Sequence, residues 1–145
     1  MTFNRRITVL IAIVAIVLAV SAAAQSANEF KTRLSAVAAD ARTRATLAGS
    51  GSASASLSGA KLTISGSFEG LLSPATKADV HSAVAAGVRG PVIASLTIPN
   101  AAAGKFSGSV ELTPAQLASL HKGGIYIQIS SEKAPDGVLW GWFLP

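Results

Sequence analysis

The feature that most constrains the fold is an alternation of apolar and polar residues that recurs in short segments along the chain. Residues 30–36 (FKTRLSA) place Phe30 and Leu34 on one side and Lys31 and Arg33 on the other. Successive side chains of a strand point to opposite faces of a sheet, so a period of two indicates a half-buried strand. The chain therefore begins its folded part with a strand.

The same period recurs to the end of the chain. It is found in residues 42–49 (RTRATLAG), 52–59 (SASASLSG), 61–70 (KLTISGSFEG), 91–98 (PVIASLTI), 105–112 (KFSGSVEL), 124–131 (GIYIQISS) and 137–144 (GVLWGWFL). The serine-rich segment has the composition of a linker, but its alternation continues to Leu57 and favours a strand. Gly66 interrupts the apolar side of its strand, which predicts a bulge or a close backbone contact there. Seven or eight short strands with turn signals between them predict an all-β fold, an antiparallel Greek-key β-sandwich or barrel.

One segment has a helical signature. Residues 113–124 (TPAQLASLHKGG) combine Thr113 at the N-cap, Pro114 at the first helical position and Gln116 at the capping-box position. A glycine pair ends the segment. We expect one short helix from about Pro114 to His121, lying over one end of the barrel.

The first 24 residues have the order of a secretory signal peptide. Arg5 and Arg6 precede an unbroken apolar run at residues 7–20, and small residues follow up to Ala24. We expect cleavage after Ala24, which leaves residues 25–145 as one β domain. The alternative is an uncleaved membrane anchor, because residues 7–24 carry no charge and approach the length of a bilayer span.

Composition excludes several classes of function. Removing Arg5 and Arg6 from the 12 basic residues leaves ten against seven acidic residues, a net charge of about +3 with no basic run. Nucleic-acid binding is not expected from so dispersed a charge. The chain has no cysteine, so it has no disulfide, no thiol catalyst and no zinc-thiolate site. The leader contributes much of the mean hydropathy of +0.48, so that value does not indicate an integral membrane protein.

In their order, these segments resemble the CHRD (chordin) domain family over about residues 30–145. The most specific part is LTPAQLASLHKGGIYIQI, which is followed by a Pro-x-Gly turn and a closing strand that carries a glycine. The resemblance implies a Greek-key domain similar in architecture to copper-zinc superoxide dismutase, found mostly in secreted proteins. By analogy, the resemblance also suggests an extracellular partner, since chordin is an extracellular protein that binds growth factors.

The resemblance also implies a copper site, of which this chain retains little. Many family members carry a His-x-His pair before the Gly-Pro turn and a further histidine in the strand that contains the tyrosine. Here the pair reads Asp79-Val80-His81, and the third position falls at about Ser130. One imidazole, one carboxylate and one hydroxyl are a poor copper set. We therefore expect no cofactor, with copper as the alternative, and we interpret His81 as an ordinary loop histidine.

Other catalytic patterns are absent from the sequence or weak. No serine lies in a G-x-S-x-G elbow. A Ser82-His81-Asp79 set would fail because neighbouring strand residues point to opposite faces. The carboxylates have surface or turn explanations, and nothing pairs them. His121 is expected to be a residue of the helix C-terminus.

The remaining candidate is the aromatic set of Tyr126, Trp140 and Trp142. The two tryptophans share a face of the last strand, and Leu139 and Phe143 occupy the opposite face, which we expect to be core. The tryptophans then form either a partly exposed stripe for a protein or glycan, or core beneath the loops. Family members usually have charged or polar residues near this place.

Three hypotheses of function follow. The leading one is an exported, non-enzymatic CHRD-like binding or structural domain with a degenerate metal site and an extracytoplasmic protein or glycan as its partner. The alternatives are a copper-dependent superoxide dismutase-like enzyme and a membrane-tethered surface protein with an uncleaved leader. The leader predicts an exported protein, which is periplasmic, secreted or on the cell surface.

Overall fold

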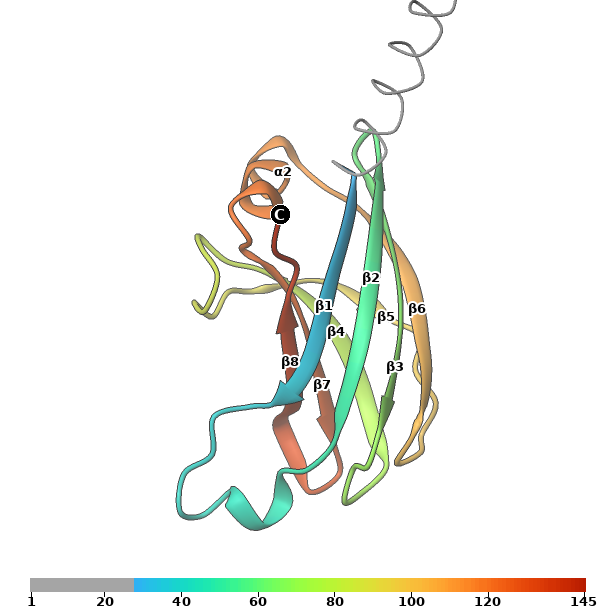
Figure 1. Ribbon diagram of the computed structural model, residues 1–145, viewed down its shortest axis with the longest axis vertical. Coiled ribbons are helices and arrows are strands. Elements are labelled where there is room, and N and C mark those ends of the chain that lie inside the picture. The colour runs from blue at the N-terminus through green and yellow to red at the C-terminus, as the bar shows by residue number, and fades with distance from the viewer. Residues whose placement is uncertain (1–27) are drawn as a thin grey trace, which may run out of the picture.

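Eight antiparallel strands form a nearly closed barrel with one short α-helix at one end (Figure 1). A computed structural model describes residues 28–145, and the predicted signal peptide lies outside the described residues. The strands are β1 (Glu29–Ala36), β2 (Ser50–Ser58), β3 (Lys61–Glu69), β4 (Ala75–Ser82), β5 (Val92–Leu96), β6 (Gly104–Glu111), β7 (Ile125–Ser131) and β8 (Ala134–Trp142). The helices are α2 (Pro114–His121) and a 3-10 turn, η1 (Arg44–Thr46). The predicted all-β class and the single short α-helix are confirmed.

The strand order is β5-β4-β7-β8-β1-β2-β3-β6, so strands far apart in sequence lie side by side. β4 pairs with β7, and β1 pairs with β8, which is the long-range pairing expected of a Greek key. The two outer strands, β5 and β6, meet through a bridge just past the end of β5. There Thr97 and Ser107 exchange backbone hydrogen bonds of 2.9 and 3.1 Å. This bridge brings the open edges of the sheet together.

Alternate residues of every strand fill the barrel. The largest fully buried side chains include Phe106, Phe143, Leu62, Ile64, Leu120, Ile125, Ile127, Ile129 and Leu139. Gly66 faces this interior, and a side chain there would collide with the Phe106 ring and with the carbonyl oxygen of Ser52. The β2–β3 and β3–β6 registers run through Gly66 without a shift. Of the two expectations for Gly66, the close contact is therefore the one observed.

The helix α2 has the predicted bounds and cap. Thr113 Oγ1 accepts a hydrogen bond from Gln116 N, and Gln116 Oε1 accepts one from Thr113 N, so the capping box is complete. Leu120 is fully buried and holds the helix over the upper end of the barrel in Figure 1. Among residues 28–145, no helix is long and apolar enough to cross a membrane.

Three segments differ from the sequence prediction. Residues 42–49 are a loop with η1 instead of a strand, because Asp40 Oδ1 accepts hydrogen bonds from the backbone of Arg42 and Thr43 and turns the chain. β8 starts at Ala134, three residues before the predicted strand at residues 137–144, and so includes the Pro-x-Gly segment that was predicted as a turn. Finally, His81 is not a loop residue, since it lies in β4.

Candidate functional site

The outward side chains of β4, β7 and β8 form the candidate site. Val80 and Ile127 are partners in the register and point into the barrel, so His81 and Tyr126, which are also partners, point outward. Tyr126 is in turn the partner of Trp142 on β8. Three aromatic side chains from three strands therefore lie next to one another on the outer face.

These side chains form a continuous aromatic row, which we define as His81, Tyr126, Trp142 and Trp140. The His81 and Tyr126 rings are stacked with centroids 4.6 Å apart and planes 12° apart. The Tyr126 and Trp142 rings follow at 4.9 Å and 29°, and Trp140 meets Trp142 edge-on at 4.7 Å. The guanidinium carbon of Arg89 lies 5.2 Å from the Trp140 ring centroid, within cation-π range. The row thus has a buried end at His81 and a cationic end at Arg89.

Burial falls along the row. Tyr126 is 1% exposed and His81 is 9% exposed, whereas Trp140 and Trp142 are half-buried. Leu139 and Phe143 are fully buried, in agreement with the assignment of that side of β8 to the core. Of the predicted partner-binding residues, the two tryptophans are accessible, and Tyr126 supports them from beneath the loop.

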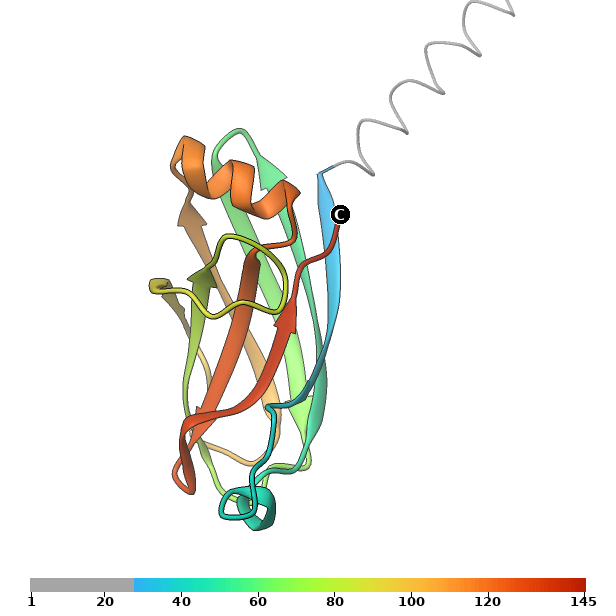
Figure 2. The ribbon, with the colours of Figure 1, turned by 90° about the vertical axis from the view of Figure 1, so that its left-hand side faces the viewer.

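The connection between β4 and β5, residues 83–91, passes over the outer side of the sheet in Figure 2, and its Gly90 contacts His81 and Tyr126 at the buried end of the row. His81 Nδ1 is 2.8 Å from the carbonyl oxygen of Gly90, and Gly90 N donates to the Tyr126 hydroxyl at 3.1 Å. A side chain at Gly90 would collide with the backbone of Ser82 and Ala83, so only glycine lets the loop lie this close. The rings of His81 and Tyr126 therefore hold the Gly-Pro turn, and with it the loop, against the sheet.

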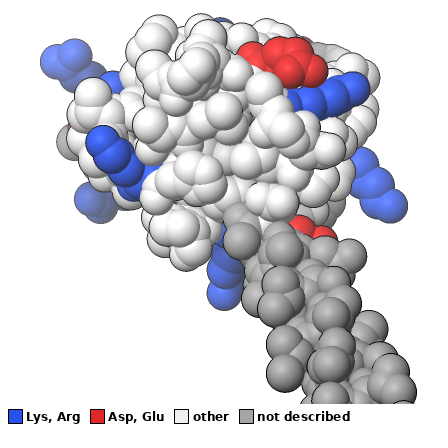
Figure 3. All heavy atoms as spheres, turned by 90° about the horizontal axis from the view of Figure 1, so that it is seen from above, with Lys and Arg blue, Asp and Glu red and all other residues white. Residues whose placement is uncertain are grey.

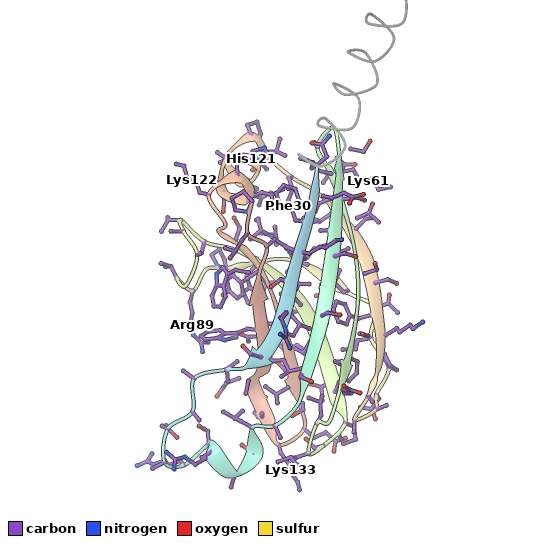
Figure 4. All side chains as sticks on the ribbon, viewed as in Figure 1. Phe30, Lys61, Arg89, His121, Lys122 and Lys133 are labelled. Carbon is purple, nitrogen blue, oxygen red and sulfur yellow. The ribbon has the colours of Figure 1, made fainter. Side chains whose placement is uncertain are left out.

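A hollow of about 260 Å³ lies at the accessible end of the row. Trp140, Trp142 and Leu144 line it together with Ala86 and Gly87 at the tip of the loop and Arg33 on β1. Figure 4 shows Arg89 beside this part of the sheet, at the outer edge of the barrel. Leu144 is 57% exposed, and Val84, which belongs to the connection between β4 and β5, is 79% exposed. The hollow thus combines aromatic and aliphatic surface with Arg33, and Arg89 lies over the Trp140 ring.

The structure does not assemble a metal site around His81. Among residues 28–145, no group of three or more histidine, cysteine or acidic residues lies close enough to hold an ion. Asp79 shares the outer face with His81, but Ser95 Oγ donates to its Oδ1 at 2.7 Å and Lys77 Nζ is 3.2 Å from its Oδ2. Ser130 is the register partner of Lys77, four positions from His81 along β4. The residues present do not fit a copper ion.

The polar chemistry of the row is nevertheless unusual. The Gly90 carbonyl can only accept, so His81 Nδ1 is the donor of this hydrogen bond. His81 Nε2, Gln128 Oε1 and Trp142 Nε1 are the buried side-chain polar atoms of residues 28–145 that have no hydrogen-bond partner. All three belong to β4, β7 and β8 on this one face. Three buried polar atoms without hydrogen-bond partners are thus concentrated at the site.

The two other groups considered from the sequence lie elsewhere. Ser82 Oγ is 3.4 Å from Ser119 Oγ, which in turn donates to the carbonyl oxygen of Ala83 at 2.6 Å. Ser82 therefore joins β4 to α2 and does not meet His81. His121 lies on α2, where its ring centroid is 6.3 Å from that of Phe30 (Figure 4).

Sequence reasoning did not identify Arg89, Gln128 or the loop as parts of the site. Gln128 Nε2 donates to the carbonyl oxygen of Asp136 at 3.1 Å, which holds its amide against β8. The position of Arg89 just before the Gly-Pro turn was the available signal. Its meaning depended on the folding of the loop over Trp140, which no local pattern encodes.

Positive charge does not gather on the end of the barrel that carries α2. Seen from that end, the Lys and Arg side chains stand apart from one another (Figure 3). Dispersed cations of this kind do not form the continuous basic surface typical of nucleic-acid binding.

Comparison with known proteins finds one family. The model of the CHRD domain matches residues 21–141. No curated protein and no solved structure matches the chain.

Proposed function

The chain belongs to the CHRD domain family, and from this membership and the aromatic row we propose that it is an exported, non-enzymatic binding domain. Its partner, an extracytoplasmic protein or glycan, docks on Trp140, Trp142 and Arg89. The metal position that the family resemblance implies is degenerate in this chain.

The observation that carries the proposal is the half-burial of the two tryptophans beside a hollow. Tryptophan and arginine are the side chains most enriched among residues that dominate binding energy, because each offers a large surface together with a polar group. The stacked His81 and Tyr126 rings hold Trp142 from behind, so little side-chain entropy is lost when a partner covers it. A domain with only a structural role has no need of this half-buried pair beside a hollow.

The absence of a paired acid and base supports a non-enzymatic role. His81 is covered by the loop, and the Asp79 carboxylate is occupied by Ser95 and Lys77. A general base must reach the proton that it removes, and neither group is free to do so. The superoxide dismutase-like alternative also needs several converging imidazoles.

Tryptophan fluorescence provides a direct test, because the chain contains only these two tryptophans. Protein and glycan fractions from the cell envelope would be titrated into the purified exported protein, and a bound partner should shift the emission. Trp140→Phe and Arg89→Gln should weaken that binding about tenfold or more, as expected for residues at the centre of an interface. Lys133→Gln, which alters a distant turn, is the matched control.

Binding without any change in emission, or equal binding by all variants, would exclude the aromatic row as the docking site. The enzyme alternative is tested separately by metal analysis and a superoxide assay on the same sample. Stoichiometric copper that His81→Ala abolishes would replace the binding proposal with the enzymatic one.

A further inference from the structure

A second surface, which adjoins the aromatic row at β1, is formed by the outward side chains of β1, β2, β3 and β6. These strands lie side by side in Figure 1. The central outward positions of the last three strands carry small hydroxyl side chains, and the outer positions of β3 and β6 carry Lys61, Glu69, Lys105 and Glu111. The hydroxyl side chains are Ser52, Ser54, Ser56, Thr63, Ser65, Ser67, Ser107 and Ser109, and all are exposed. We call this surface the hydroxyl face.

Core packing explains the inward residues of these strands but not the outward ones. Ala53, Ala55 and Gly66 are small because the interior is crowded by rings such as that of Phe106. An exposed strand position tolerates many polar side chains, and long charged ones would serve solubility equally well. An array of hydroxyls instead gives a flat surface of short side chains with regularly spaced hydrogen-bond donors and acceptors. The Ser54 and Ser65 oxygens on neighbouring strands, for example, are 3.5 Å apart.

Three cations border this array. In the register, Arg33 on β1 is followed by Ser52, Ser67 and then Lys105 on β6, so one row has a cation at each end. Adjacent strands are about 4.8 Å apart, which puts the two ends of the row about 14 Å apart. Lys31 heads the next row, and a hollow of about 750 Å³ spans both rows.

All the charged side chains that line the hollow are cations. Its charged lining residues are Lys31, Arg33 and Lys105, and no carboxylate lines it. Glu29 and Glu69 lie one row beyond it on either side. The salt bridge found among residues 28–145 joins Lys77 to Asp79, so these three cations have no acidic partner. They are available to an anionic ligand.

We propose that the hydroxyl face binds an acidic polysaccharide. The serine hydroxyls can donate to and accept from sugar hydroxyls, and the cations at the ends can pair with repeated carboxylate or sulfate groups. A span of about 14 Å suits an extended chain of several sugars better than a single small anion. The proposal is independent of the function assigned to the aromatic row.

Other occupants fit this face less well. A second copy of the chain would bring three cations against three cations. A nucleic acid would find no aromatic side chain on which to stack its bases. An apolar protein partner would find hydroxyls where it needs apolar surface.

The test uses the exported protein and three probes, namely alginate as a polyuronate, heparin as a sulfated polysaccharide and neutral dextran. Calorimetric titration should show binding to at least one acidic probe, weakened by added salt, and none to dextran. Lys31→Gln/Lys105→Gln should weaken binding about tenfold or more, since it removes two charge-assisted contacts. Arg33 is left unchanged because it also lines the hollow at the tryptophans.

The matched control is Lys122→Gln/Lys133→Gln, which removes the same charge. Figure 4 shows Lys122 near α2 and Lys133 at the other end of the barrel. This variant should bind like the wild type, whereas Ser52→Ala/Ser67→Ala should bind more weakly at unchanged charge.

Three results would overturn the proposal. The first is failure of the wild type to bind either acidic probe. The second is an equal loss in both double-lysine variants, which would reduce the effect to net charge. The third is binding that shifts tryptophan emission and ignores the Lys31 and Lys105 changes, which would place the polysaccharide on the aromatic row. Failure of the hydroxyl face alone leaves the function proposed for the tryptophans standing.

Discussion

At the scale of single residues, His81 shows how a side chain changes meaning with its surroundings. Considered from the sequence, it was a loop histidine with little effect on stability. In the structure it is a strand residue that stacks on Tyr126 and lies 2.8 Å from the Gly90 carbonyl oxygen. It therefore connects the sheet to the loop that covers it, and its contacts give it a structural role.

His81→Ala should lower the free energy of unfolding by about 2–3 kcal/mol. The change removes a buried ring and the shorter of the two hydrogen bonds to the Gly90 carbonyl oxygen, leaving only the one from the Tyr126 hydroxyl at 3.3 Å, and both effects are destabilising. This replaces the value of about 0.5 kcal/mol that an exposed loop histidine would give. Urea denaturation of the purified protein measures it.

His121→Ala is the control for this substitution, since His121 is exposed on α2. It should change stability by no more than about 0.5 kcal/mol. Equal small effects from both substitutions would mean that the loop is held without His81.

At the scale of elements, α2 is the part of the fold that local sequence determines most completely. Its N-cap, first helical proline and capping glutamine lie within four consecutive positions. In the structure these residues take the predicted places, and both capping-box hydrogen bonds form. By contrast, residues 42–49 have the alternation of a strand but no neighbouring strand to pair with. Their loop conformation follows from the Asp40 turn.

Thr113→Ala should destabilise the protein by about 1 kcal/mol, because the Gln116 amide loses its acceptor at the start of α2. The loss should also appear as faster hydrogen exchange of the α2 amides. Leu120 is buried beneath the helix, so fraying of α2 also weakens the end of the barrel.

Ser109→Ala removes a comparable hydroxyl from an exposed strand position that caps nothing. It should leave both the stability and the α2 exchange rates nearly unchanged. A similar loss from the two substitutions would argue that the capping box contributes little in this fold.

At the scale of the whole molecule, the barrel presents two different surfaces on one closed sheet. Arg33 on β1 lies where they meet, since it lines both the hollow at the tryptophans and the hollow of the hydroxyl face. The barrel closes through the Thr97 and Ser107 backbones, so both surfaces are carried on a rigid frame. Such a frame suits the binding role proposed for the aromatic row.

Export is a prediction, and the N-terminal residue of the mature protein tests it. We expect N-terminal sequencing of the exported protein to begin at Gln25, because the leader has a basic, an apolar and a small-residue region in that order. Recovery of the chain from Met1 in a membrane fraction would instead support the tethered alternative.

The sequence by itself determined the strand class, the helix and the inward side of most strands. The physical reason is that these depend on a period of two and on contacts within four residues, as with Leu139 and Phe143 or Thr113 and Gln116. Only the tertiary structure decided that β4 pairs with β7 and that the loop before β5 folds over His81. It also decided that the serines of β2, β3 and β6 form one face. These features join residues far apart in the chain, and their energy comes from the burial and pairing that exist only once the barrel has closed.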